Sequence, residues 1–180
     1  MAVTEETRHV CEASVREHVA TQDAPYRYVG SGLPNVFLTG IKYYVCKICG
    51  MQSADIPALK ELLKSLGRTV VEKRSPLTGE EVRFLRKRLG LRSGDFATMV
   101  GCTPVHFSNI ETGKTPPGKP LDRLIRVIYG MMAGDKKLAE AMKNFGQWIT
   151  DIHGDDKEER IIAAHVKNNH WVIQSELSAA

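Results

Sequence analysis

A pair of cysteines with the spacing of metal ligands is the first feature of this sequence with a recognisable chemistry. The run Cys46-Lys47-Ile48-Cys49-Gly50 directly follows a predicted strand. Two thiolates on such a turn can hold one side of a tetrahedral zinc ion, and the glycine eases the backbone. The sequence has no second pair of this spacing, so Cys11 is the nearest further thiolate, and His9 or His18 could be the fourth ligand. The alternative is a metal-free region, stabilised by packing, in which these histidines lie on the surface.

A second group of candidate residues lies on one predicted helix that begins at Pro104 and ends before Gly113. Its outward face carries side chains that can recognise base pairs: Val105, His106, Ser108 and Asn109. Asn109 is the strongest candidate for direct readout, because a side-chain amide can form two hydrogen bonds with adenine. His106 could donate to a base or a phosphate, and Val105 could contact a thymine methyl group.

Three further residues could contact phosphates, which fixes register without carrying sequence information: Ser93, Thr103 and Lys114. Thr103 can also cap the helix that begins at Pro104 and so direct its N-terminus toward a phosphate. Residues 68–126 contain 12 lysines and arginines against 6 aspartates and glutamates, whereas the remaining residues contain 13 against 15. A basic middle of this kind is typical of a segment that faces DNA, and an ordinary solvated surface has the same composition.

A neighbouring helix and a tight turn must position this predicted recognition helix. Gly101 stands where a left-handed backbone is needed, and Ala97 is small enough to let two helices approach closely. The inner faces of the two helices would meet at four apolar residues: Phe96, Val100, Phe107 and Ile110. The pattern predicts Cys102 as a small hydrophobic residue of this core and not as a metal ligand.

Helical periodicity predicts further elements on both sides of this unit. Thr78 and Glu81 fit a capping box at the start of one helix. Another helix opens at Pro120 with an apolar stripe at Leu121, Leu124, Ile125 and Ile128, and residues 136–148 allow one more. Upstream, a helix begins near Pro57, and Gly67 is expected to end it.

Strand patterns occur near the two ends of the chain. Residues 26–45 alternate apolar and polar side chains between turn residues, which predicts a small antiparallel sheet that ends at Cys46. The run Trp171-Val172-Ile173 predicts a short strand. The fold class is therefore α+β, with a zinc-knuckle-like antiparallel sheet and helix first and an all-α helix-turn-helix domain after it. The charged segment 68–76 is expected to link them, which gives domains at 1–75, 76–135 and 136–180. The last is a C-terminal extension whose apolar residues could contribute to a dimer.

The middle of the chain resembles a known DNA-binding family. Leu91-Arg92-Ser93-Gly94-Asp95-Phe96-Ala97-Thr98-Met99-Val100-Gly101-Cys102-Thr103, followed by Phe107-Ser108-Asn109-Ile110-Glu111-Thr112-Gly113-Lys114, resembles the Xre/Cro-type helix-turn-helix. The final five residues are the most specific part of this resemblance. One departure is Arg92, where the family usually has a capping serine or threonine, and Ser93 is expected to take that role.

The resemblance extends to a larger family. Tyr26-Arg27-Tyr28-Val29, Gly32-Leu33-Pro34-Asn35-Val36-Phe37-Leu38, Gly40-Ile41 and the run from Cys46 to Gly50 are similar to the YgiT/MqsA-type zinc-finger antitoxins. Ile56-Pro57 and the run from Leu77 to Arg86 continue the similarity, which covers roughly residues 9–130. It implies structural zinc, a front domain that contacts a toxin where one exists, and a rear domain that dimerises and represses the operon. The chain departs from the family at the first cysteine pair, where only Cys11 remains.

These features favour a cytoplasmic, homodimeric DNA-binding repressor that binds a double-stranded operator and regulates its own operon as an antitoxin. One alternative is a stand-alone Xre-family regulator with no toxin partner, and another is a protein that mainly sequesters a toxin through residues before Pro76. A thiol-redox protein using Cys46 and Cys49 is disfavoured, because such pairs usually lie at the N-terminus of a helix.

Enzymatic and membrane functions are not expected. No Ser/His/Asp set, paired carboxylates or phosphate-binding loop has a recognisable context, and a polar loop accounts for Asp151 and His153. The N-terminus is polar, which argues against a signal peptide, and no apolar run approaches the length of a membrane span.

Overall fold

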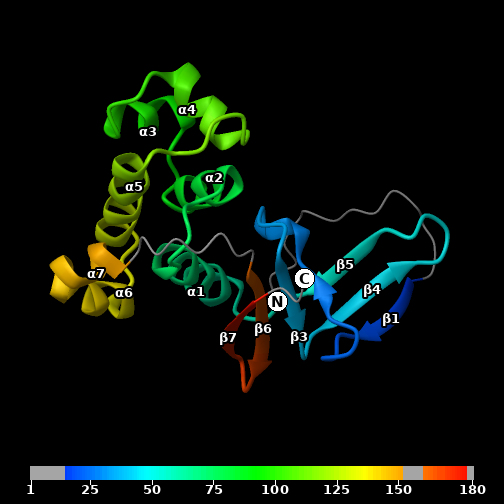
Figure 1. Cartoon of the computed structure of the whole chain (residues 1–180). Helices are drawn as coiled ribbons and strands as arrows, with labels where there is room; N and C mark the ends of the chain where they lie inside the picture. The colour runs from blue at the N-terminus through cyan, green and yellow to red at the C-terminus, as the bar shows by residue number, and fades with distance from the viewer. Residues whose placement is uncertain (1–14, 152–159, 178–180) are drawn as a thin grey trace.

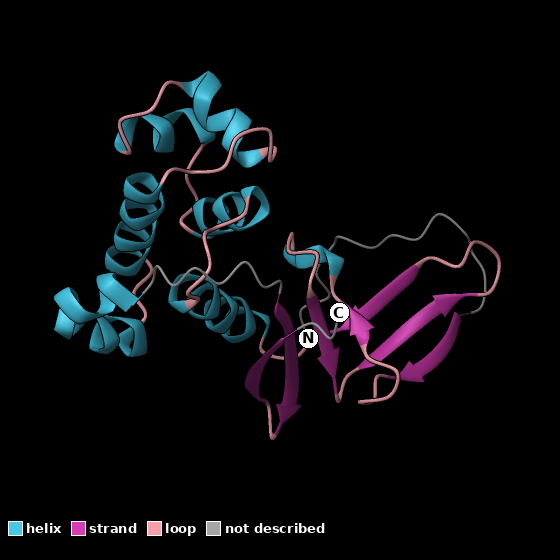
Figure 2. Ribbon diagram, in the orientation of Figure 1, coloured by secondary structure: helices cyan, strands magenta, loops and turns pink. Residues whose placement is uncertain are grey.

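The computed structural model of this chain describes residues 15–151 and 160–177, and it has a mixed α+β fold. Most helices gather on one side and two small sheets lie on the other, with α1 (Leu59–Glu72) between them (Figure 1). Coloured by secondary structure, the separation of helices from strands is plain (Figure 2). The predicted α+β class is therefore confirmed.

The first sheet has three antiparallel strands in the order β1-β4-β5. These strands are β1 (Val15–Val19), β4 (Lys42–Cys46) and β5 (Gln52–Asp55). Val15 is paired with Cys46, so the cysteine pair lies at the end of this sheet where β1 begins. A short turn after Cys46 connects β4 to β5.

The second sheet joins the two ends of the described chain. Its strands, in the order β2-β3-β6-β7, are β2 (Tyr26–Arg27), β3 (Val36–Thr39), β6 (Arg160–Lys167) and β7 (His170–Leu177). β3 and β6 are parallel, whereas the other two pairs are antiparallel. Asn168 and Asn169 both have positive φ and form the two-residue turn between β6 and β7, as expected for a tight hairpin.

The predicted single antiparallel sheet over residues 26–45 is wrong, because β3 and β4 belong to different sheets. The chain turns at Gly40, which has φ 78°, and leaves the plane of β3. β4 then pairs with β1, and β3 pairs with β6, whose paired residues follow 126 positions later. Alternation of apolar and polar residues indicates that a segment forms a strand, but it does not identify the strand with which that segment pairs.

Most helices lie at their predicted positions: α2 (Gly79–Arg88), α3 (Ser93–Met99), α4 (Pro104–Glu111) and α5 (Lys119–Met132). The capping box of α2 is present, with Thr78 and Glu81 each bonded to the other's backbone amide. Residues 136–151 form α6 (Lys136–Ala141), a 3-10 turn (Met142–Asn144) and α7 (Phe145–Asp151). A further 3-10 turn covers Val29–Ser31.

Gly67 does not end α1, which continues to Glu72. A Cβ atom at Gly67 would lie 2.0 Å from the hydroxyl oxygen of Tyr129 on α5. The glycine therefore serves the close approach of α1 and α5, and its position near a charged segment gave a misleading stop signal. The helix also begins at Leu59 and not at Pro57, because Ala58 has a left-handed backbone with φ 47°.

The segment between α1 and α2, which the sequence predicts as a linker, is held by the fully buried Arg126 of α5. Its guanidinium donates to Asp122 at 2.6 Å and to the carbonyl oxygens of Val71, Lys73 and Ser75 at 2.6–2.8 Å. Asp122, also fully buried, accepts a further hydrogen bond from the Leu77 amide at 2.6 Å. This connection is therefore fixed to α5 through buried charge and backbone carbonyls.

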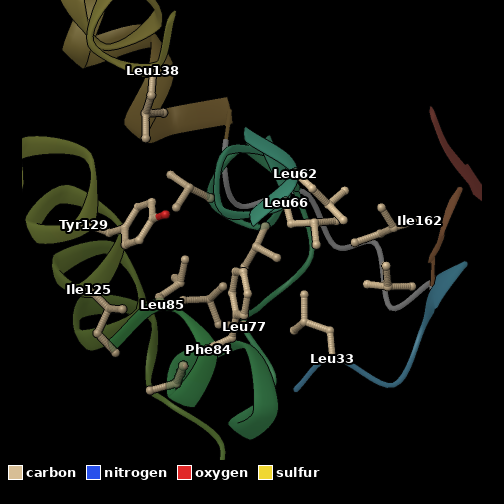
Figure 3. Packing of buried hydrophobic residues seen from close by; sticks show 14 of the residues in the cluster. Leu33, Leu62, Leu66, Leu77, Phe84, Leu85, Ile125, Tyr129, Leu138 and Ile162 are labelled. Atoms are coloured by element: carbon tan, nitrogen blue, oxygen red, sulfur yellow. The ribbon is translucent and has the colours of Figure 1, made fainter. Parts of the chain in front are cut away.

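One hydrophobic core extends from the second sheet through α1 into the helices. Figure 3 shows Leu62 and Leu66 of α1 between Ile162 of β6 on one side and Leu85 and Tyr129 on the other. All of these residues are buried. α1 is thus the shared element that places the sheets and the helices relative to one another.

Two apolar residues of the predicted C-terminal extension pack within the chain itself. Trp171 is 7% exposed, and its indole nitrogen donates to the Pro57 carbonyl at 2.8 Å. Trp148 is also buried. These side chains are covered without a second copy, which removes the reason for assigning them to a dimer interface. Among the described residues, no helix is both long and apolar enough to cross a membrane.

Candidate nucleic-acid interface

The connection between α3 and α4 has the features that the sequence predicts for a tight turn between two helices. Gly101 has φ 73°, and Pro104 occupies the first turn of α4. The Thr103 hydroxyl accepts a hydrogen bond from the His106 amide at 3.2 Å and so caps α4. The N-terminus of α4 is therefore well defined, and Thr103 to His106 are all exposed.

The inner faces of α3 and α4 meet as predicted. The rings of Phe96 and Phe107 pack edge to face with centroids 5.5 Å apart. Ala97 and Ile110 are fully buried and Val100 is nearly so. Cys102 is half-buried against this core, as the pattern predicts for a small hydrophobic residue. The core leaves the opposite face of α4 toward solvent.

The buried carboxylate of Glu111 fixes the C-terminal end of α4. Arg86 of α2 donates to its two oxygens at 2.7 and 3.2 Å, and the Ser93 hydroxyl donates to one of them at 2.9 Å. Arg83 donates to the Glu111 backbone carbonyl at 2.7 Å. These bonds connect α2, the start of α3 and the end of α4 through one carboxylate.

Sequence reasoning missed the role of Glu111 and misplaced that of Ser93. The backbone of Arg92 occupies the N-cap position of α3, and no side chain caps this helix, so the expected capping by Ser93 is wrong. The available signal was a single acidic residue beside Ile110 and four positions after Phe107, on the apolar face of α4. An ionised residue on such a face needs a buried partner of opposite charge.

α2 approaches the end of α4 closely at Gly79. A Cβ atom at this position would lie 2.4 Å from the Ile110 carbonyl oxygen and 2.8 Å from the Gly113 amide nitrogen. No side chain larger than hydrogen fits without moving one of the helices. Gly79 and Glu111 together determine the orientation of α4 relative to α2.

The outward face of α4 carries the predicted base-reading residues. Val105 is 73% exposed, His106 and Ser108 are exposed, and Asn109 is half-buried. Lys114 is exposed just beyond the helix. α4 itself contains no lysine or arginine, and its one acidic residue, Glu111, is buried and paired.

Exposed basic side chains lie on the elements that flank α4: Lys87, Arg88, Arg92, Lys114 and Lys119. The same flanking helices also carry two exposed acidic residues, Glu80 on α2 and Asp95 on α3, so the exposed basic side chains outnumber the exposed acidic ones. Uncharged side chains such as those on α4 can bind base edges, whereas the lysines and arginines suit phosphates.

The cysteine pair lies at the turn between β4 and β5. Cys46 is buried and Cys49 is exposed. The Ile48 amide donates to the Cys46 sulfur at 3.4 Å, and Gly50 has φ 71°. Both sulfurs lie on one tight turn, so this turn fits half of a zinc site.

The structure does not bring His18 to this turn. His18 is paired with Tyr43, on which its ring stacks at 5.1 Å between centroids. That pair is three positions along the strand from Cys46, or about 10 Å. Cys11 and His9 lie outside the described residues. Within residues 15–151 and 160–177, no three His, Cys, Asp or Glu residues form a group that could hold a metal ion.

Comparisons with protein-family models, with curated proteins and with solved structures found no match to this chain. Among the candidate sites predicted from the sequence, the exposed face of α4 has the best-defined geometry, because Thr103 caps its N-terminus and Glu111 fixes its C-terminus.

Proposed function

We propose that this protein is a sequence-specific DNA-binding repressor in which α3 and α4 form a helix-turn-helix and α4 enters the major groove. The observation that carries this proposal is that α4 has one exposed, uncharged face while its opposite face is held firmly against α2 and α3. Val105 and His106 are exposed and Asn109 is half-buried on one face of α4, while Glu111 holds α4 against α2 and α3. A recognition helix needs such rigidity, because base readout depends on hydrogen bonds with little tolerance for displacement.

The phosphate contacts would come from residues around α4. Thr103 at its N-terminus and Lys114 beyond its C-terminus remain candidates, with Lys87, Arg88 and Arg92 nearby on α2 and before α3. The Ser93 hydroxyl already donates to Glu111, so its role is better described as positioning α4 than as binding phosphate.

A repressor with one recognition helix per chain reads an operator best as a homodimer. Two copies would bind half-sites about one helical turn, or ~34 Å, apart or a multiple of that distance. The resemblance of residues 9–130 to YgiT/MqsA-type antitoxins suggests that the operator lies in front of the protein's own gene. It also suggests that the region before Pro76 contacts a toxin.

The same resemblance, and the tight turn that carries Cys46 and Cys49, support a structural zinc ion in the front region. Cys46 and Cys49 would supply two ligands, and Cys11 with His9 would complete the site. Zinc held this way stabilises a small sheet and supplies no catalytic chemistry. Metal analysis of the purified protein, compared with Cys46→Ser/Cys49→Ser, should show about one zinc per chain in the first and none in the second.

The direct test of the function is binding to the DNA upstream of the protein's gene, against scrambled DNA, over a salt series. Tight binding with a large preference for the upstream DNA is expected. Equal and weak affinity for both DNAs, lost steeply as salt rises, would reflect counterion release alone and would contradict sequence-specific binding.

Asn109→Ala tests the recognition face directly. Loss of a two-bond contact with adenine should cost roughly 1–3 kcal/mol of binding and relax base preference at one position. Lys114→Ala is the matched control, since loss of a phosphate contact should weaken binding evenly across sequences and reduce the salt slope by about 1. If Asn109→Ala also weakens all sequences evenly, Asn109 contacts the backbone and not a base.

Three alternatives remain distinct from this proposal. A stand-alone regulator would bind the operator but co-purify with no toxin. A protein whose main act is toxin sequestration would keep its activity when Val105, His106 and Asn109 are replaced. A thiol-redox protein is the least favoured, since the pair lies between β4 and β5 and not at the start of a helix.

A further inference from the structure

The outer face of the four-stranded sheet is hollowed, while its inner face packs toward α1. Side chains alternate between the two faces of a strand, so Leu38 and Ile162 face the core and Ala163 faces outward. The hollow on the outer face has a volume of about 580 Å³. That volume lies within the range of about 300–1,000 Å³ that is typical of sites for small organic molecules.

The hollow exists because the centre of this face carries a small residue. Ala163 on β6 is paired with Phe37 of β3 on one side and with Gln174 of β7 on the other. Its neighbours two positions away along β6, on the same face, are the larger Ile161 and His165. A methyl group surrounded by four larger side chains leaves a depression. Its floor extends over three strands, which is roughly 10 Å across.

One polar side chain of the hollow is held in a fixed orientation. The hydroxyl oxygen of Thr39, a residue that is only 9% exposed, lies 2.9 Å from Nδ1 of His165. A Cβ atom at Gly40 would lie 3.1 Å from Cε1 of the same ring, so the imidazole packs against this backbone. Thr39 therefore occupies one ring nitrogen, and the other, Nε2, can exchange a hydrogen bond with a ligand.

Two glutamine side chains supply further hydrogen-bonding groups toward opposite edges of the sheet. Gln174 lies on β7, and Gln22 lies in the loop that leads into β2. Both are exposed, and each amide can donate and accept hydrogen bonds. The surface between them is apolar and includes Phe37, Ile161 and Val172. Among the described residues that line the hollow, none is an aspartate, glutamate, lysine or arginine.

These groups define a ligand that is uncharged, flat and polar at its edge. An ion would lose part of its water in the hollow without meeting an opposite charge, so a neutral molecule is favoured. The sheet floor and the Phe37 ring suit a flat ring system. His165 and the two glutamines offer donors and acceptors to groups at the edge of such a ring. A floor of roughly 10 Å is longer than one six-membered ring and accommodates two fused rings with a substituent.

We propose that the hollow formed by Phe37, Ala163, His165 and Gln174 binds a neutral bicyclic heteroaromatic molecule, the chemical class that includes purines and their nucleosides. The site does not depend on the proposed function, because it lies on the outer face of the sheet, whereas α4 lies among the helices (Figure 1). A bound molecule would contact β3, β6 and β7 together. It would thus connect strands from the two ends of the described chain.

Isothermal titration calorimetry of the full chain without DNA tests the site, with adenosine, guanosine and hypoxanthine as probes. At least one probe should bind with a dissociation constant of about 100 μM or lower, as expected for molecules of this size. Ala163→Leu should weaken that binding at least about tenfold, because the larger side chain occupies the floor of the hollow. Ala139→Leu is the matched control, since it makes the same change at an exposed position of α6. Absence of binding for all three probes, or undiminished binding by Ala163→Leu, would overturn the proposal.

A second variant keeps the test decisive if Ala163→Leu disturbs β6. Gln174→Leu removes the amide and retains most of its volume, so it should weaken binding roughly tenfold. Gln52→Leu makes the same change at an exposed position of β5, in the first sheet, and should bind as the unmodified protein does. If the two glutamine variants bind equally tightly, the ligand does not occupy this hollow and the proposal is wrong.

Two further measurements address the charge of the ligand and its location. Urate, a purine that is an anion at neutral pH, should bind at least about tenfold more weakly than the tightest of the three probes. Equal binding of urate would contradict the preference for a neutral molecule. With the tightest probe bound, amide hydrogen exchange should slow in β3, β6 and β7. Slowing confined to other elements would place the ligand elsewhere and overturn the proposal.

Discussion

The helical region from Thr78 to Met132 and the four-stranded sheet differ in how far apart along the chain their contacts lie. In the helical region, Thr78 contacts Glu81, Phe96 packs on Phe107, and Arg86 pairs with Glu111. In the sheet, β3 pairs with β6, and Val36 lies opposite Ile162. Long-range pairing requires closure of a large loop, whereas these helical contacts join residues 3 to 25 positions apart.

The two regions also differ in what stabilises them. The helical region contains two buried ion pairs, Arg86 with Glu111 and Arg126 with Asp122. In its described part, the sheet is stabilised by its backbone ladder and by apolar residues such as Val36, Leu38 and Trp171. The first region should therefore respond most to loss of a charge, and the second to loss of apolar volume.

The largest expected effect is that of Arg126→Met. Asp122 would remain buried without its partner and three backbone carbonyls would lose a donor, which should cost about 3–5 kcal/mol of unfolding free energy. Urea unfolding measures the loss. Arg126→Met/Asp122→Leu removes the unpaired carboxylate and should recover part of it. A cost below about 1 kcal/mol for the single variant would show that buried charge does not stabilise this region.

Trp171→Ala tests the sheet. It removes a buried indole and its hydrogen bond to the Pro57 carbonyl, with an expected cost of roughly 3 kcal/mol. Amide hydrogen exchange should accelerate in β3, β6 and β7 and much less in α2 to α4. Trp171→Phe keeps most of the packing and should cost less. Equal acceleration of exchange in both regions would mean that they unfold as one unit and do not differ in their free energy of local unfolding.

Gly79→Ala should have a smaller effect on stability but a clear effect on DNA binding. The added methyl group would overlap the Ile110 carbonyl, at a cost of about 1–3 kcal/mol, and would displace α4. The measurements are thermal unfolding and affinity for the upstream DNA. Gly94→Ala in α3, where a Cβ atom meets nothing within 4 Å, is the matched control and should be neutral or slightly stabilising. Equal DNA affinity for both variants would contradict the role of Gly79 in orienting α4.

The smallest expected effect concerns Asp135, which connects α1 to the start of α6. Burial alone would raise the pKa of Asp135, but hydrogen bonds from Arg68 and from the backbone amides of Leu138 and Lys137 outweigh it and lower the pKa. The carboxylate therefore contributes stability that is present above its unfolded pKa and is lost as pH falls below about 4. Asp135→Asn should be less stable at pH 7 and should lose less stability between pH 5 and 3. Parallel pH curves for the two proteins would contradict this account.

The sequence predicted the helices that surround the candidate site because their signals are local. The capping box at Thr78, the cap at Thr103 and the left-handed Gly101 each depend on residues within a few positions. The apolar spacing of Phe96, Phe107 and Ile110 predicted which faces meet. Once the core-facing side of α4 was predicted, the residues on its other side were predicted to be exposed.

The positions of charged residues within the core were not predictable in the same way. Glu111 and Arg126 are ordinary surface residues by type, and only their partners make burial possible. Gly67 and Gly79 resemble turn or helix-end residues, yet each serves a close approach between helices. Apart from Asp122, four positions before Arg126, the residues on which these roles depend lie 18 to 62 positions away.

The sequence by itself determined where most helices and the strands β2, β3, β4 and β7 lie, because hydrophobic periodicity and caps act over three to four residues. It did not predict β1, β5 or β6. Only the tertiary structure decided that β3 leaves β4 to pair with β6, and that the C-terminal hairpin completes a sheet begun near the N-terminus. The physical reason is that a strand's hydrogen bonds are identical for every possible neighbour. Its partner is chosen by the packing of the whole chain around α1.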